Sequence, residues 1–252
     1  MNTAEINKSL FFRLAYDVTT ESHGRYNIGT YKEKKLHLIL KRYFEQDQNY
    51  HEVPCCGYIA DILKDNSITE IETSGFTGLN PKLDAYLPAY QVTLVLPLAA
   101  RKYVSWIDPE TGDISPKRLS PKKQNIYTAL CECIRIKKHM GNENLRILAV
   151  MLEMEEYRML DGWSRDRKKG SHRFERVPAD ILDIYELSDK ASFAAWIPEA
   201  CQENFTVETF AKNVKIPTDN ARTVIKLMEH MGLLTFTGKS GRKFLYSRTK
   251  DS

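Results

Sequence analysis

The sequence predicts an α/β protein in which a mixed sheet is flanked by helices, followed by a small module of helices and a hairpin. Three observations support this fold class. A helix, three short strands, a second helix and a fourth strand follow one another between residues 31 and 99. The run "QVTLVLPLA" (91–99) is almost continuously apolar, as in a strand that is covered on both faces. Residues 205–248 contain two capped helices and a hairpin.

The composition favours a soluble globular protein. Of the 252 residues, 42% are hydrophobic and 28% are charged, which allows a core of useful size. No apolar run is long enough to cross a bilayer, and the start of the chain lacks the pattern of a signal peptide. We therefore expect a cytoplasmic protein with no membrane partner. The five cysteines include no C-x-x-C pair, so we expect them to pack as small apolar residues rather than to bind zinc.

The first predicted helix spans residues 31–46. Its apolar residues follow the i, i+3, i+4, i+7, i+8 spacing of one buried face: Leu36, Ile39, Leu40, Tyr43 and Phe44. Glu33 lies three residues before Leu36 and begins the same inward stripe. This acid has two interpretations, an inward functional carboxylate or an N-terminal acid that the helix dipole favours.

The next segments predict strands at 51–63 and 67–74, with a turn at "KDNS" and a further break within the first segment. A helix follows within 76–90, where Pro81 suits the first turn. The strand at 91–99 then completes the α/β core.

The following segments are less regular. We expect a hairpin around "PETGD" and a helix within 124–140. Residues 145–160 fit either a long strand or a helix, because they contain few β-branched residues. Residues 174–200 are expected to be a connector with a helix around 189–197. The predicted domains are 1–160 for the α/β domain, 161–203 for a basic segment and connector, and 204–252 for the C-terminal module.

Three acids interrupt the apolar strand pair. Glu70 and Glu72 are two residues apart, so on a strand they project from one face. Asp61 lies on the preceding strand, close to a cross-strand neighbour of Glu70 or Glu72. Like charges at this distance repel and raise one another's pKa values, and a divalent cation such as Mg²⁺ would offset the repulsion. The alternative is that the acids form the solvent face of an edge hairpin.

The order of elements and the acids together resemble the PD-(D/E)XK nuclease superfamily, which has the restriction-endonuclease-like fold. That superfamily has an Asp on its second strand, matched by Asp61, and Glu-x-Lys on its third, matched by Glu70. Glu72 stands where Lys is commonest, which departs from the pattern. In some members the lysine lies on the following helix, where this sequence has Lys82, and some have an acid on the first helix, where it has Glu33.

The resemblance implies phosphodiester hydrolysis with Mg²⁺ or Mn²⁺ as the cofactor. The implied metal ligands are Glu33, Asp61 and Glu70. The implied catalytic residues are Asp61, Glu70, Glu72 and Lys82. Glu72 would act as a general base or as a further ligand, and Lys82 would stabilise charge near the attacked phosphate.

Basic segments suggest a polyanionic partner. Residues 115–123, 163–176 and 238–250 are rich in Lys and Arg, although the net charge of the chain is only +4. Each segment could also be a solvated loop, but three together favour phosphate contact. The nucleic-acid-binding residues expected in the first segment are Lys117, Arg118, Lys122 and Lys123.

The C-terminal module resembles a winged helix-turn-helix. Thr206 and Thr218 suit the starts of two helices, and Gly232 suits the end of the second. The second helix buries a stripe that contains Ala221, Val224, Ile225 and Met228. Such a helix can lie in the major groove of DNA. The residues expected to contact nucleic acid are Arg222, Thr223 and Lys226 on this helix and Lys239, Arg242 and Lys243 on the hairpin.

The sequence therefore predicts a Mg²⁺-dependent DNA endonuclease with a winged-helix DNA-binding module. Because nucleases that cut both strands often act as dimers, a homodimer is included among the expected partners. One alternative is a non-catalytic DNA-binding regulator with a nuclease-like fold, which the missing Glu-x-Lys lysine favours. Another is a protein-interaction module whose acids face the solvent.

Overall fold

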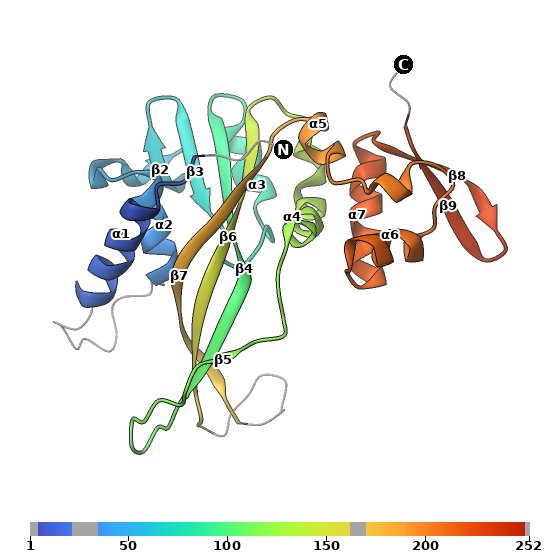
Figure 1. Cartoon of the computed structure of the whole chain (residues 1–252). Coiled ribbons are helices and arrows are strands. Elements are labelled where there is room, and N and C mark those ends of the chain that lie inside the picture. Colours follow the sequence, from blue (N-terminus) through green and yellow to red (C-terminus); the bar gives the residue numbers. More distant parts are fainter. Residues whose placement is uncertain (1–4, 22–34, 162–169, 250–252) are drawn as a thin grey trace.

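The computed structural model describes residues 5–21, 35–161 and 170–249 (Figure 1). Its centre is a sheet in the order β1-β2-β3-β4-β6-β7, with the short β5 paired to β4. The first three strands are antiparallel, β3, β4 and β6 are parallel to one another, and β7 returns antiparallel to β6. The sheet is therefore mixed, and helices cover it, which confirms the predicted α/β class.

The part of the chain up to β4 follows the predicted order of helix, three strands, helix and strand. It is preceded by a helix that the sequence did not indicate. The elements are α1 (Lys8–Glu21), α2 (Lys35–Phe44), η1 (Gln48–Tyr50), β1 (His51–Cys55), β2 (Tyr58–Lys64), β3 (Ser67–Ile71), α3 (Asn80–Tyr86) and β4 (Gln91–Ile107).

The rest of the α/β portion is built on long strands. Its elements are β5 (Arg118–Leu119), α4 (Ile126–Cys133), η2 (Ile134–His139), β6 (Leu145–Met159) and β7 (His172–Leu187). Residues 145–159 thus form a strand, which settles the choice between strand and helix. The hairpin expected around "PETGD" is present as a turn that brings Ile114 opposite Ile107.

The sheet is buried on both faces, which explains the apolar run at 91–99. Along β4, Leu94 and Leu96 point into one core, whereas Val95 and Ala99 point into the other. Helices α1 and α2 cover the second face with residues such as Phe11, and α3 and α4 cover the first. Glu70 shares the side of Ile68 and so faces the core beneath α3.

The structure differs from the sequence prediction at the expected connector. Residues 172–187 do not link two domains but form β7, which pairs with β6 along most of its length. Irregularities in the pairing fall between Arg173 and Glu175, around Ala179 and around Leu182. Because each extra residue reverses the side that later side chains face, the period-two pattern of a strand is lost in the sequence. The predicted boundary at residue 160 therefore separates two strands that are neighbours in one sheet.

The C-terminal part contains two helices and a hairpin. Its elements are α5 (Lys190–Ala194), η3 (Glu199–Cys201), α6 (Val207–Val214), α7 (Thr218–His230), β8 (Leu234–Ser240) and β9 (Lys243–Arg248). The Thr206 hydroxyl accepts the backbone N–H of Thr209, as expected of an N-cap. Gly232 follows α7 at φ +72°, a conformation that favours glycine. The predicted stripe on α7 is fully buried.

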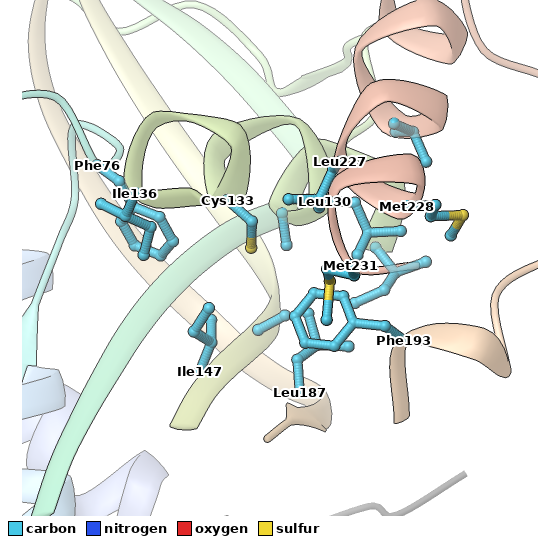
Figure 2. Packing of buried hydrophobic residues seen from close by; sticks show 14 of the residues in the cluster. Phe76, Leu130, Cys133, Ile136, Ile147, Leu187, Phe193, Leu227, Met228 and Met231 are labelled. Carbon is cyan, nitrogen blue, oxygen red and sulfur yellow. The ribbon is translucent and has the colours of Figure 1, made fainter. Parts of the chain in front are cut away.

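Helix α7 also packs on the sheet domain through α4. Figure 2 shows Leu227 of α7 beside Leu130 and Cys133 of α4, with Met231 next to Phe193. A hydrogen bond also joins α7 to η2: His230 Nε2 donates to the carbonyl oxygen of Lys137 over 2.9 Å. One hydrophobic cluster therefore runs from the sheet through α4 into the C-terminal helices.

Two observations bear on the expectations drawn from composition. All five cysteines are free thiols, and Cys133 and Cys201 are buried as apolar packing residues. None of the helices in the described ranges combines the length and the apolar character that a membrane crossing requires.

We predict that Leu130→Ala lowers the free energy of unfolding by about 2–5 kcal/mol, because it opens a cavity where α4 meets α7. Urea denaturation followed by circular dichroism measures this change. Leu119→Ala is the matched control, since Leu119 is 51% exposed on β5, and we expect it to change stability little. Equal effects of the two substitutions would contradict a core shared by the sheet and α7.

Candidate active site

The predicted acids lie where β2 and β3 run side by side. Ile62 pairs with Thr69, so the antiparallel register sets Asp61 opposite Glu70. Glu72 directly follows β3, and its backbone N–H still donates to Val95 of the parallel strand β4 over 2.8 Å. The three carboxylates therefore gather at the end of β3. This excludes the alternative of an exposed hairpin face, because Glu70 is only 2% exposed.

Lys82 joins this group from α3. Its ammonium lies 2.7 Å from Glu70 Oε2, and the side chain of Lys82 is mostly buried. The other carboxylate oxygen, Glu70 Oε1, is buried with no hydrogen-bond partner in the described part of the chain. Since buried carboxylate oxygens are normally paired, Oε1 is a lone acceptor that a cation or a proton would satisfy.

Asp61 has two different partners. Its Oδ2 accepts the backbone N–H of Ile71 over 2.7 Å and lies 3.1 Å from His37 Nε2. His37 comes from α2, so helices on either side of the strand pair contribute to the cluster. The sequence reasoning missed His37. A signal existed, because His37 is four residues after Glu33 and would share its side of a helix.

The three acids lie in different environments, which raise the pKa values of Glu70 and Glu72 and lower that of Asp61. Burial and then the Asp61 carboxylate raise the pKa of Glu70 to about 7, against the opposing effect of Lys82. Burial and Asp61 likewise raise the pKa of Glu72. Burial alone would raise the pKa of Asp61, but His37, the Ile71 N–H and Lys82 together lower it. Neighbouring groups with opposed pKa shifts are typical of acid–base sites.

The fit of a divalent metal can be tested on these residues. Among the residues described, no three His, Cys, Asp or Glu side chains converge closely enough to hold a metal ion by themselves. Glu33, the expected third ligand, lies outside the described residues. Mg²⁺ is commonly held by one or two carboxylates plus water and substrate phosphate. Asp61 and Glu70, with its lone Oε1, meet that smaller requirement.

The residues that follow these acids in the chain line a cleft of about 680 Å³. The loop Thr73–Gly75 forms one side, Gln124 and Thr128 at the start of α4 another, and the segment from Arg173 to Arg176 on β7 a third. Position 75 requires glycine for two reasons. Its φ is +90°, and a Cβ there would lie only 2.4 Å from the Glu132 carboxylate. The cleft is large enough for a nucleotide-sized ligand.

The residues of the first basic segment lie far along the chain from the acids, next to the long strands. Arg118 is on β5, and Lys117 forms an ion pair with Glu155 of β6. Lys122 and Lys123 are exposed in the loop before α4. Their exposure is compatible with phosphate contact, but the structure does not bring them into the carboxylate cluster.

The residues expected to bind nucleic acid in the C-terminal part are accessible to different extents. Arg222 and Lys226 are exposed on α7, whereas Thr223 is half-buried and its hydroxyl donates to the Asp219 carbonyl. Arg222 also forms a 2.7 Å ion pair with Asp219. On the hairpin, Lys239 lies over the ring of Phe244, Arg242 is exposed, and Lys243 lies 3.9 Å from Glu208.

The sequence reasoning noticed a basic segment at 163–176 but did not single out its residues. Residues 162–169 lie outside the described residues. Arg173 and Arg176, at the end of the segment, line the cleft together with Phe174. Their role depends on irregular strand pairing, for which the sequence has no clear signal.

Comparisons with known proteins give a family but no activity. The family described as Domain of unknown function (DUF8091) matches residues 34–188. A relative described as an uncharacterized protein of Treponema pallidum (strain Nichols) is 28% identical over 222 residues, which cover 88% of this chain and 87% of the relative. No solved structure matches the chain.

We predict a pH-dependent stability that originates at Glu70. Because its folded-state pKa is raised to about 7, the stabilisation is present at low pH and is lost as pH rises through about 7. Glu70→Gln does not titrate, so its stability relative to wild type should increase from pH 5 to pH 8 by up to about 3 kcal/mol. Chemical denaturation across this pH range measures the difference.

The matched control is Glu110→Gln, at an exposed position in the turn after β4. Its stability should run parallel to wild type at every pH. A Glu70→Gln variant whose stability also runs parallel to wild type would refute the assignment of this titration to Glu70.

Proposed function

Because the chain belongs to the family described as Domain of unknown function (DUF8091), we propose its function from its own residues: metal-dependent hydrolysis of phosphodiester bonds in DNA. The observation that carries this proposal is the convergence of Asp61, Glu70 and Lys82 at the end of β3, followed in the chain by a loop that lines a cleft with two arginines of β7. Acids that hold a hard cation and cations that hold phosphate are the two requirements of such chemistry.

The cluster supports a division of roles. Asp61 has a lowered pKa and stays ionised at neutral pH, so it is suited to hold a cation. Glu72 has a raised pKa and can take the proton from a water molecule as the water oxygen attacks phosphorus. Lys82, held by Glu70, supplies a positive charge that stabilises the negative charge developing on the phosphate oxygens.

A metal ion would be held by Asp61 and by Glu70 through Oε1. A bound Mg²⁺ lowers the pKa of coordinated water and neutralises phosphate charge. The residues of the chain then have to orient the phosphate, and Lys82 lies among the acids, 2.7 Å from Glu70, for this purpose. The observed order of elements, with β3 parallel to β4, also agrees with the restriction-endonuclease-like fold that the PD-(D/E)XK resemblance implies.

For the C-terminal part, we propose a winged-helix DNA-binding module. The two helices and the hairpin occur in the order that this fold requires. Its exposed cations, Arg222 and Lys226 on α7 and Arg242 on the hairpin, are available for phosphate contact. Packing on α4 covers another side of α7, which restricts any nucleic acid to the exposed side.

We predict that Asp61→Asn, Glu70→Gln and Lys82→Met each reduce cleavage of DNA by at least about a hundredfold, as expected when a charge-stabilising group is lost. The assay incubates purified protein with supercoiled plasmid and Mg²⁺ or Mn²⁺. The matched control is Asp65→Asn in the β2–β3 turn. Asp65 is exposed at φ +52°, which Asn tolerates, and we expect this variant to cleave like wild type.

One observation favours a second candidate, a DNA-binding regulator without catalysis. Lys82 already neutralises Glu70, and no three-ligand metal group exists among the described residues. Under this candidate, wild-type protein binds DNA without cleaving it, and its affinity is the same in Mg²⁺ and in EDTA. Cleavage by wild type that Asp61→Asn abolishes excludes the regulator, whereas metal-independent binding without cleavage excludes the nuclease.

We predict that the double substitution Arg222→Ala and Lys226→Ala weakens binding to duplex DNA. The slope of log affinity against log salt should fall by about 0.9 for each lost phosphate contact. Fluorescence anisotropy over a salt series measures the slope. Lys64→Ala at the β2–β3 turn is the control, and an equal loss in both proteins would argue against DNA contact by α7.

A further inference from the structure

A β-bulge shapes one wall of the cleft. Tyr157 of β6 pairs with Glu175 of β7, but the next residue, Arg158, pairs with Arg173, so Phe174 has no partner. In a regular strand, Arg173 and Arg176 would point to opposite faces because they are three residues apart. The unpaired Phe174 turns Arg173 to the same side of the sheet as Arg176, so both guanidinium groups reach the same carboxylate, Glu156.

Glu156 is surrounded by more positive charge than it can neutralise. It is 2% exposed and lies within 3.1 Å of Lys102 and 3.0 Å of Arg158. Arg173 and Arg176 lie 3.6 and 3.5 Å from it. Four cations therefore share one carboxylate. The repulsion from Arg173 adds to burial in lowering the pKa of Arg176, and a second anion would relieve it.

The other acids of the cleft are already paired. Glu175 forms a 2.9 Å ion pair with Lys35, and Glu132 accepts from Arg135 over 3.0 Å and from the Phe76 N–H over 3.1 Å. Glu132 and Glu175 thus each have a cation of their own, and neither has to neutralise Arg173 or Arg176, which line the same cleft. Arg173 and Arg176 instead share Glu156 with Lys102 and Arg158, so the unbalanced positive charge lies on their side.

The bulged residue itself is an exposed aromatic. Phe174 is 58% exposed and lines the same cleft as Arg173 and Arg176. An exposed ring flanked by two arginines can stack on a planar apolar face while the guanidinium groups hold an anion. Nucleotides combine these two features, since each has a base with a π-face and a phosphate.

We propose that Arg173, Phe174 and Arg176 form a binding subsite for an unpaired nucleotide, with its phosphate at the two arginines and its base stacked on Phe174. A base in a duplex has both faces covered by its neighbours, so stacking on a single Phe requires a base that has left the helix. The inference rests on the proposed nucleic-acid function and narrows its substrate to single-stranded or locally unpaired strands.

The test measures binding of full-length protein to a short fluorescent oligothymidylate in EDTA, which prevents metal-dependent cleavage. Phe174→Ala should weaken this binding by about tenfold, the size of one base–aromatic stack. It should leave the affinity for a duplex of the same sequence unchanged. Phe12→Ala, at a 47% exposed position on α1, is the matched control and should bind like wild type. On an oligomer with abasic sites, Phe174→Ala should have no effect.

The arginines are tested separately. Arg173→Gln should reduce the salt dependence of oligothymidylate binding by about 0.7 in the log–log slope, as one single-strand phosphate contact predicts. Arg13→Gln on the exposed side of α1 is the control. Unchanged urea denaturation midpoints establish that the variants remain folded, and Phe174→Ala meets this condition most readily because its side chain is exposed.

The outcomes separate this inference from the proposed catalysis. If Phe174→Ala binds oligothymidylate as Phe12→Ala does, or if wild type binds no single strand at low salt, the subsite is refuted, whether or not Asp61-dependent cleavage occurs. Suppose that Phe174→Ala weakens binding to oligothymidylate but not to the abasic oligomer, and that no substrate is cleaved in Mg²⁺ or Mn²⁺. The subsite then stands and the nuclease proposal falls.

Discussion

The burial of one carboxylate, Glu70, organises the surrounding structure. Removing a carboxylate from water is unfavourable unless a partner compensates, and here Lys82 compensates one oxygen while the other has no partner in the described part of the chain. Asp61 stands opposite and is held by His37 and by the backbone of Ile71. The register of β2 and β3 and the placement of α2 and α3 are therefore all tied to the charges at the end of one strand.

These charges lie where the sheet changes its character. The strands β1 to β3 are short and antiparallel, whereas β4, β6 and β7 are long and continue well beyond the end of β3 (Figure 1). The cleft lies between the loop Thr73–Gly75, which follows the carboxylates in the chain, and the arginines of β7. The cleft thus brings Arg173 and Arg176 close to the loop that follows the carboxylates, and its space is wide enough for a nucleotide.

The sequence predicted the elements whose signals are local. The stripe on α2, the strand pair with Asp61 and Glu70, the buried run of β4 and the helices α6 and α7 all follow from local spacing and end signals. The cap expected at Thr218 was wrong, because Thr218 is the first residue of α7 and Pro217 precedes it with no side-chain hydrogen bond. It failed at β7, because bulges break the period-two pattern that identifies a strand. For the same reason it noticed the basic segment but missed the grouping of Arg173 and Arg176 on β7. His37 was missed although it lies four residues after Glu33, because only the structure shows its contact with Asp61.

The cluster shared by α4 and α7 limits how the two halves of the chain could have been assembled during evolution. A C-terminal module on a flexible tether can be exchanged for another without harm to the domain that precedes it. Here, a chain without α7 would expose Leu130 of α4 to water (Figure 2). Exposed apolar patches of this kind promote aggregation. Exchange of the whole C-terminal segment would therefore disrupt the core, whereas substitution of surface side chains would leave it intact.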